Sequence, residues 1–372
     1  VPGIDVCELM PRHARLAHRY SIIRSIHHTF SDHGGGHKKF LTGRDPLSPV
    51  DFVTDYPMVG SCVAKLRPAV RPGLPSYIAG TDNGRDGIDV FSFGAAYLGP
   101  TTHPVMIPGD PSAPGFAVAN MLPRPELENR LDPRSTLLDQ LDRSPFSAGQ
   151  SLQNLRRRGI EMLTSEEARK ALDLNREPEK LRHRYGMGPW GQRCLLARRL
   201  VEAGATFVTM VLENPMRKGE SLPKDTTYNW DSHAVNCHIF TDCHLRLPTY
   251  DQAVTALIED LYDRGLDRKV LLIVTGEFGR TPRISYHQGR PGRDHWPRAM
   301  SVLVSGGGLK MGRIVGSTNP RGEDPKDQPL TPNDLWATMF RHLNIDPETI
   351  FHDRLNRPLP ILTGGEPIAD LI

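Results

Sequence analysis

The sequence predicts an α/β fold with a mostly parallel sheet sandwiched by helices. Residues 191–202 have a helical pattern, Gly204 follows them, and an apolar run occupies 206–212. The same order of helix, glycine and apolar run recurs between Tyr250 and Val274. Glycine commonly ends a helix, and a strand reached through a helix usually runs parallel to the strand before it. The two units therefore predict right-handed parallel crossovers.

The second of these apolar runs, V-L-L-I-V at 270–274, is continuous enough to be a strand covered on both faces. We expect it to lie in one sheet with three other strands, all with their carboxyl ends on the same side. The other strands are predicted at 21–26, 206–212 and 299–305. Glu277 directly follows the run, and ligands of open α/β sheets bind beyond the carboxyl ends of strands.

Length and composition exclude several classes of protein. The chain has 372 residues, which fits a single domain over 1–372. Its 46 basic and 43 acidic residues leave a net charge of +3, which is too balanced to indicate nucleic-acid binding. No apolar run reaches the ~18 residues that a membrane span needs. Five cysteines are too few, and odd in number, for a disulfide framework. The chain begins with Val1 rather than Met, so we expect that an N-terminal piece has been removed, and no signal peptide is visible.

The N-terminal part should contain a basic helix within 7–20, the strand 21–26 and a polar loop. This loop, 27–37, holds four histidines and three glycines and leads to a turn at 42–46. A solvated loop without function is the alternative, but the position directly after a strand favours a functional one.

The middle of the chain changes character twice. Residues 51–123 are rich in Pro and Gly and predict short strands and covering loops. Residues 124–185 are highly charged, and the capping box at 164–167 opens a helix, so we predict a helical insertion within the single domain. An outer layer is favoured over a lid for this insertion.

The C-terminal part continues the α/β pattern. Thr331 and Pro332 stand at the N-cap and first position of a last helix, with Asp334 in its first turn. The Pro-rich tail, 347–372, is expected to wrap the surface. We find no internal repeats.

Three polar clusters follow predicted strands or lie a short loop beyond them. They are 27–37, 231–244 and 277–295. Histidine and carboxylate side chains are the ligands of zinc, manganese and iron ions, so the three clusters are predicted to converge on one metal centre.

Motifs for other kinds of site are incomplete or missing in this sequence. Cys237 and Cys243, each followed by His, do not have a recognised zinc-ligand spacing. The triple glycine at 306–308 lacks the Lys-Ser/Thr ending of a phosphate loop and is better explained as a turn. No G-x-S-x-G elbow exists, which disfavours a serine hydrolase of that type.

The sequence resembles the alkaline phosphatase superfamily, which includes sulfatases and phosphodiesterases. Residues 41–46 (L-T-G-R-D-P) resemble the sulfatase segment after the nucleophile helix, and 250–279 and 329–347 resemble its helix-strand-metal turn and its late helix. A closer resemblance covers nearly the whole chain through the motifs G-Q-R-C-L-L-A-R-R-L-V-E-A-G, W-D-S-H, G-E-F-G-R-T-P and G-R-D-H-W-P. These motifs resemble an exported sulfatase-like family, domain of unknown function 1501. That resemblance implies the fold, export through a twin-arginine leader and a periplasmic or extracellular location, but no known activity.

The sequence departs from the catalytic pattern of the superfamily. The nucleophile position falls on or near His33, and Glu277-Phe278 replaces the Asp-His pair of ligands. Asp231 and His233 resemble an Asp-x-x-x-His ligand pair with shorter spacing, and His295 resembles the late His ligand. The first Asp ligand would lie before Val1. A standard two-metal phosphatase centre is therefore not expected, and one remodelled metal site is.

The resulting expectation is a metal-dependent hydrolase of sulfate or phosphate esters. Its ligands are predicted to be Asp231, His233, Glu277 and His295, around zinc, manganese or calcium. His33 and His37 are predicted as ligands or general bases, and Arg280 and Arg293 as clamps for the substrate anion. The substrate would be a small-molecule or glycan ester. The alternatives are a non-catalytic binding or scaffold protein of the same fold and a cytosolic housekeeping phosphatase, which would require a gene without a leader.

Overall fold

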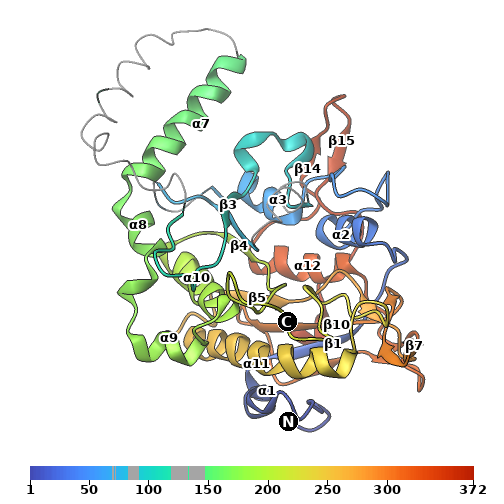
Figure 1. The fold of residues 1–372 in the computed structure, drawn as a ribbon. Helices are drawn as coiled ribbons and strands as arrows, with labels where there is room; N and C mark the ends of the chain where they lie inside the picture. Colours follow the sequence, from blue (N-terminus) through green and yellow to red (C-terminus); the bar gives the residue numbers. More distant parts are fainter. Residues whose placement is uncertain (69–70, 72, 83–91, 119–132, 134–146) are drawn as a thin grey trace.

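The computed structural model describes residues 1–372 except 69–70, 72, 83–91, 119–132 and 134–146. Two sheets form its centre, and Figure 1 shows helices on either side of them. The larger has the order β11-β1-β10-β5, and the smaller has the order β3-β2-β4. The strands of the larger are β11 (Ile314–Val315), β1 (Ser21–Ile26), β10 (Met300–Gly306) and β5 (Leu271–Val274). Those of the smaller are β3 (Val105–Pro108), β2 (Tyr77–Thr81) and β4 (Phe207–Met210).

The α/β class is confirmed, and the smaller sheet is parallel throughout. The prediction that the strands near 206 and 270 share one sheet is wrong, because β4 pairs with β2 whereas β5 pairs with β10. The strands also do not all point one way, since β10 runs antiparallel to both β1 and β5. The chain between β5 and β10 contains no helix to carry it across a face of the sheet, so it returns antiparallel instead.

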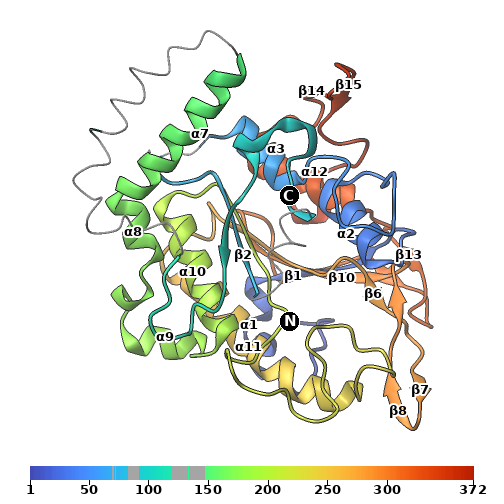
Figure 2. The same cartoon turned by 45° about the horizontal axis from the view of Figure 1, so that its top comes forward.

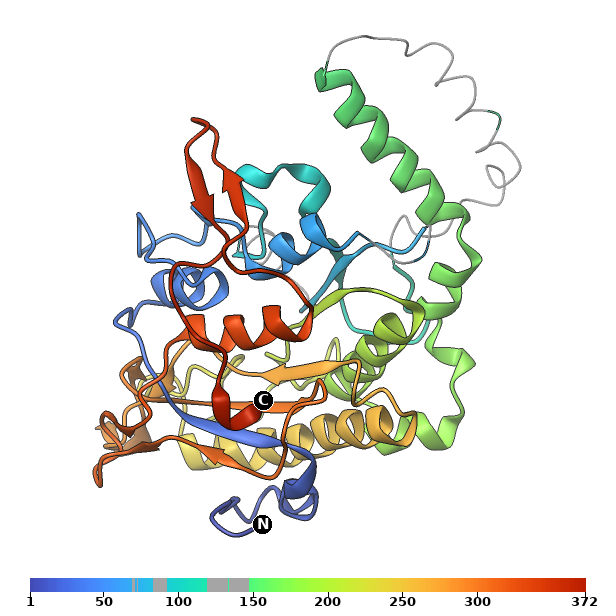
Figure 3. The same ribbon diagram turned by 180° about the vertical axis from the view of Figure 1, so that it is seen from behind.

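Helices cover both faces of the larger sheet, as Figure 3 shows from behind. On one face, Ile23, Val302 and Val304 pack in a core with Phe340 of α12 (Pro332–His342). On the other face, Leu303 packs with Leu16 of α1 (Pro11–Leu16) and with Ile258 of α11 (Ile239–Asp263). Successive residues of a strand point to opposite faces, which is why 302 and 304 share a core that excludes 303.

Helix α10 (Pro189–Ala203) leads into β4 of the smaller sheet, and α11 connects β4 to β5 of the larger sheet. α10 ends at Gly204, which has a φ of 113°, as the sequence predicts. α11 begins at Ile239, not Tyr250, and continues through Pro248. Leu195 and Leu196 of α10 share a core with Leu257 of α11, and Ile78 of β2 lies in the same core. This core holds the smaller sheet and the two helices together.

The predicted insertion is helical where it is described. α7 (Ser147–Thr164) projects from the body of the molecule in Figures 1 and 2, and α8 (Glu166–Leu172) and α9 (Glu179–Tyr185) follow it. The capping residue Ser165 accepts a hydrogen bond from Ala168 N. The part of the prediction on 124–132 and 134–146 lies outside the described residues.

The histidine-rich segment is a loop only up to Asp32, because α2 (His33–Thr42) begins there. The Asp32 side chain accepts a hydrogen bond from Gly34 N at 2.9 Å, which caps the helix, and Gly43 ends it with a φ of 70°. These are common start and stop signals, and they override the low helix propensity of three consecutive glycines.

The remaining elements are short. They are α3 (Val59–Leu66), η1 (Ala17–Arg19), η2 (Ala96–Leu98), η3 (Pro100–Thr102), η4 (Leu174–Arg176), η5 (Ala369–Leu371), β6 (Gly279–Arg280), β7 (Ser285–His287), β8 (Arg290–Gly292), β9 (His295–Trp296), β12 (Ser317–Thr318), β13 (Pro325–Asp327), β14 (Ile350–His352) and β15 (Pro358–Pro360). Within the described residues, no helix is long and apolar enough to cross a membrane.

Candidate metal centre

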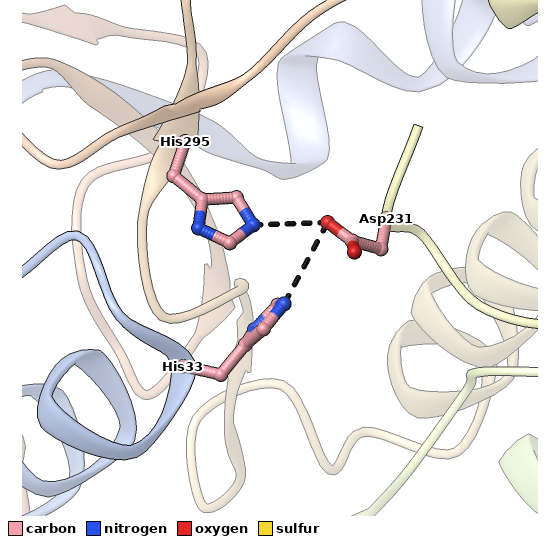
Figure 4. A group of neighbouring side chains, drawn as sticks. All are labelled: His33, Asp231 and His295. Atoms are coloured by element: carbon pink, nitrogen blue, oxygen red, sulfur yellow. Dashed lines mark hydrogen bonds and ion pairs between the residues drawn. The ribbon is translucent and has the colours of Figure 1, made fainter. Parts of the chain in front are cut away.

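Residues from the three polar clusters meet at one place. His33 comes from the first turn of α2, Asp231 and His233 from the loop before α11, and His295 from β9. Figure 4 shows His33 and His295 turned toward the Asp231 carboxylate from different directions. The segments lie far apart in the sequence and are brought together by the fold.

The first turn of α2 lies directly on the turn after β5. A Cβ added to Gly36 would lie 2.9 Å from Phe278 Cδ1 and 3.2 Å from Glu277 Cγ, and one added to Gly34 would lie 2.5 Å from Asp51 O. Only glycine leaves room for this approach. Gly36 therefore allows α2 to pack closely on the Glu277 turn, where His33 contacts Glu277, and Gly34 allows it to pack on Asp51.

The loop before α11 is held against the β8 region in a similar way. Arg293 N donates a hydrogen bond to Ser232 O at 3.0 Å, and a Cβ on Gly292 would lie 2.0 Å from Ala234 N. This contact places His233 beside His295, with 3.0 Å between their Nε2 atoms.

One carboxylate oxygen, Asp231 Oδ1, is the centre of the cluster. The Nε2 atoms of His295, His233 and His33 lie 2.9, 3.0 and 3.6 Å from it. Arg280 Nη2 lies 2.8 Å from the same oxygen. Four nitrogen atoms around one oxygen exceed the hydrogen bonds that its lone pairs accept well. A cation among the three imidazoles and the carboxylate would relieve this crowding.

The three imidazoles use their ring nitrogens in the same way, with Nδ1 on an outer oxygen and Nε2 toward Asp231. Each Nδ1 lies 2.6 Å from an oxygen, which is Glu277 Oε1 for His33, Asp294 Oδ1 for His233 and the Ser31 carbonyl for His295. These oxygens accept an N–H, so each Nδ1 is the protonated nitrogen. Each Nε2 then faces the centre. It can donate to Asp231 in the metal-free protein or, once its proton is displaced, offer a lone pair to a metal, as metal-ligating histidines do.

The spacing of these atoms also fits a metal ion. Ligand atoms about 2.0–2.1 Å from zinc, at the corners of a tetrahedron, lie roughly 3.3 Å apart. The measured separations from Asp231 Oδ1 to the three nitrogens, 2.9–3.6 Å, bracket that value. Among the described residues, His33, Asp231 and His295 form a group that could hold an ion, with ligand atoms all within 4.8 Å of one another. His233 lies outside this group of three, although its Nε2 is 3.0 Å from both Asp231 Oδ1 and His295 Nε2. Their side chains are 17–36% exposed, so a ligand from solvent can reach the centre.

Electrostatics keep the carboxylates ionised. Burial alone would raise the pKa of Asp231, but hydrogen bonds from His295, His33 and Arg280 hold that pKa well below its usual range. Burial likewise opposes ionisation of Glu277, whereas the charges of His37 and His33 lower its pKa to about 2. The same carboxylates, Asp231 first and then Glu277, raise the pKa of His33 to about 9.

All the predicted site residues lie in this region, but some of them contact the centre only through other residues. Glu277 Oε1 contacts His33 Nδ1 and lies 3.7 Å from His37 Nε2. Arg280 also donates to Trp230 O at 2.9 Å, and Arg293 donates to the carbonyls of Thr281 and Arg280. Both arginines are thus bonded to protein oxygens beside the centre.

Three partners of the site were not predicted as functional. Asp294 accepts from His233, the Ser31 carbonyl accepts from His295, and Asn236 Nδ2 donates to Asp231 O at 2.9 Å. The adjacency of Asp294 to His295 was the available signal, since metal-ligating histidines are commonly held by a carboxylate. A main-chain partner such as the Ser31 carbonyl leaves no signal in the sequence.

Comparison with known proteins identifies the family. The family model described as "Protein of unknown function (DUF1501)" matches residues 1–372, so the chain belongs to that family. No curated protein matches it significantly.

Solved structures show a more distant similarity. Ps i-CgsB in complex with k-i-k-neocarrahexaose has 10% sequence identity and a TM-score of 0.40, and the match covers 91% of this chain and 67% of that one. The phosphonate monoester hydrolase SpPMH from Silicibacter pomeroyi has 12% identity and a TM-score of 0.38, with 91% and 69% covered. Because both TM-scores and identities are low, these two structures carry no argument about the function of this chain.

Proposed function

We propose that this member of the DUF1501 family is a metal-dependent hydrolase of sulfate or phosphate esters, with its metal centre at His33, Asp231, His233 and His295. The observation that carries the proposal is the shared use of the ring nitrogens in the three imidazoles, each with Nδ1 2.6 Å from an outer oxygen and Nε2 toward Asp231. Three imidazole nitrogens and one carboxylate oxygen suit zinc best, with manganese and calcium as the other candidates.

The divalent ion would supply Lewis-acid polarisation of a phosphoryl or sulfuryl oxygen. Arg280 directs the Asp231 carboxylate through its 2.8 Å contact with Oδ1. Glu277 keeps the proton on His33 Nδ1, so that Nε2 stays turned to the centre. Direct ligation by Glu277, as expected from the sequence, is the alternative role, and the variant Glu277→Gln separates the two roles.

The other predicted residues have roles that follow from their positions. His37 Nε2 lies 3.7 Å from Glu277 Oε1, and we propose that this nitrogen holds or moves a proton at the edge of the site. Arg280 and Arg293 place positive charge beside the centre, and Arg293 Nη1 is the group proposed to face the substrate anion. A small-molecule or glycan ester is the proposed substrate, and a periplasmic or extracellular location follows from the resemblance to exported proteins.

One observation favours a second candidate, a binding protein without turnover. The position that resembles the superfamily's nucleophile is taken by His33, which has no hydroxyl and lies against Glu277 at 2.6 Å. Such a protein would retain metal and ligand binding but would not hydrolyse esters.

Elemental analysis and an ester panel test both candidates on the same purified protein. We expect about one equivalent of a divalent metal after reconstitution and turnover of an aryl sulfate, a phosphate monoester or a phosphodiester. Less than roughly a tenth of an equivalent would overturn the metal centre. A full equivalent of metal without turnover of any ester would favour the binding protein.

A further inference from the structure

The centre depends on a segment that has no regular structure of its own. Asp231 lies between the end of β4 at Met210 and the start of α11 at Ile239, and no helix or strand interrupts that stretch. Such a stretch keeps a side chain in place only where other groups hold its backbone. The contacts of residues 227–231 therefore show what sets the position of the Asp231 carboxylate.

Arg246, on α11, holds this segment from below the surface. Its side chain is fully buried, with Nε 2.7 Å from Asp242 Oδ2 and Nη1 2.7 Å from the Glu213 carbonyl. Nη2 donates to the Thr227 carbonyl. Asp242 Oδ1 in turn accepts a hydrogen bond from Thr227 N at 3.1 Å. The Arg246–Asp242 pair thus forms hydrogen bonds with both the main-chain N–H and the carbonyl of Thr227.

Trp230, the neighbour of Asp231, is held by the same helix. The Arg246 guanidinium carbon lies 5.4 Å from the centre of the Trp230 ring. The Trp190 ring stacks on the same indole, with 5.3 Å between the ring centroids and an interplanar angle of 15°. Trp230 Nε1 donates to the Leu212 carbonyl at 2.6 Å. The indole is therefore fixed by stacking, by charge and by a hydrogen bond.

Arg246 and Trp230 are not among the proposed metal ligands. Both are linked to the centre through the peptide unit between Trp230 and Asp231. Arg280 Nη2 donates to Trp230 O at 2.9 Å and to Asp231 Oδ1 at 2.8 Å. A shift of Trp230 therefore moves the carbonyl and the carboxylate that share one Arg280 amino group. The N–H of Asp231 itself is bonded within the same segment, to Asn229 Oδ1 at 3.0 Å.

We propose that Arg246 is a positioning residue of the metal centre, which acts on the Asp231 carboxylate through Thr227 and Trp230. This inference rests on the proposed function for its consequence, which is metal affinity, but the ordering of residues 227–231 is a property of the protein without metal. A guanidinium is needed because its planar fork serves Asp242, Glu213 O and Thr227 O together, whereas an ammonium is a single point of charge.

The test compares Arg246→Lys with Arg198→Lys in the full chain. Arg198 is a matched control because it is also buried on a helix and paired with carboxylates, at Glu177 and Asp260, which lie outside residues 227–231. Three quantities are measured for each variant. They are the melting temperature, the zinc dissociation constant by chelator competition, and hydrogen–deuterium exchange of the peptide spanning 226–233 in metal-free protein.

We expect both variants to lower the melting temperature and only Arg246→Lys to act on the site. It should speed exchange in the 226–233 peptide and weaken zinc binding by about 10-fold, the lower end of effects for groups that hold a metal ligand in place. Cobalt-loaded Arg246→Lys should also show altered visible absorption, because its ligand geometry changes. Wild-type exchange and affinity in Arg246→Lys, or equal losses in Arg198→Lys, would overturn the inference.

Two further results keep the inference separate from the proposed function. If the wild type binds no metal, the proposed function fails. Faster hydrogen–deuterium exchange of the 226–233 peptide in Arg246→Lys alone would still support the positioning role. Unchanged exchange in that variant would refute it. If Arg246→Lys does not fold, Trp230→Phe replaces it, because this side chain is 38% exposed and the change removes only the hydrogen bond to Leu212 O and part of the stack. Trp230→Phe is expected to weaken zinc binding in the same direction, and wild-type affinity would refute the role of the segment.

Discussion

His33 and Glu277 are joined by a contact of 2.6 Å between Nδ1 and Oε1, although 244 positions separate them in the sequence. The contact links the first turn of α2 to the turn after β5. It determines which nitrogen of His33 faces Asp231. The His33 ring therefore lies between the Glu277 and Asp231 carboxylates.

This relationship makes the effect of Glu277→Gln diagnostic. If Glu277 acts by holding His33, the amide oxygen can still accept the Nδ1 proton, and we expect zinc affinity to fall by about 10-fold because the negative charge is lost. Chelator competition measures the loss. Glu259→Gln is the control, since Glu259 pairs with Arg184 away from the centre. A loss as complete as that of His33→Ala would show instead that Glu277 ligates the metal.

His233→Ala should abolish stoichiometric metal binding. It removes a nitrogen 3.0 Å from both Asp231 Oδ1 and His295 Nε2. His238→Ala is the matched control in the same loop, because His238 caps α11 by accepting from Thr241 N. We expect it to retain the metal. Elemental analysis after dialysis measures the metal content of both variants. A full equivalent of metal in His233→Ala would show that His233 is not a ligand.

Gly36→Ala should destabilise the protein by about 1–3 kcal/mol, the usual cost of overpacking. The new Cβ would lie 2.9 Å from the Phe278 ring and 3.2 Å from Glu277 Cγ, so α2 must move away from the site. Denaturant unfolding measures the change in free energy. Gly159→Ala, in α7 with open space around its Cβ, should be stabilising by ~0.5–1 kcal/mol. Equal effects of the two substitutions would contradict the packing account.

Stability should fall as the pH drops below about 6.5, in part because of His13. Burial lowers the pKa of His13 from its ordinary value of 6.5, although Asp251, 2.6 Å from Nδ1, opposes this. The ring also lies against Tyr250 and Tyr20. Below pH 6.5 the unfolded chain binds a proton that the folded protein resists, so protonation favours unfolding. The slope is at most about 1.4 kcal/mol per pH unit for one such group.

The variant His13→Gln isolates this contribution, because glutamine can donate to Asp251 but does not titrate. The free energy of unfolding of both proteins is measured between pH 8 and pH 5. We expect the wild type to lose more stability than the variant as the pH falls below 6.5. Parallel curves for the two proteins would show that His13 does not cause the slope.

The elements that the sequence determined by itself are those set by neighbouring residues. β1 occupies Ser21–Ile26 as predicted, Gly204 ends α10, and the Thr331 capping box opens α12. Apolar periodicity, caps and terminating glycines act within a few residues, so they can be recognised without the rest of the fold. For the same reason, the residue types of the three polar clusters could be identified as metal-binding in character.

Tertiary structure decided how those elements and side chains meet. β4 and β5 were expected in one sheet, but strand pairing depends on hydrogen bonds between distant segments, and β10 takes the place beside β5. The orientation of His33 likewise depends on Glu277, and that of His233 on Asp294, through contacts that span 244 and 61 positions. A side chain's rotation is set by the partner that its nitrogen finds in the folded protein. The sequence alone therefore predicted the residue types of the proposed centre, and only the packing of α2 on the turn after β5 decided which atoms face it.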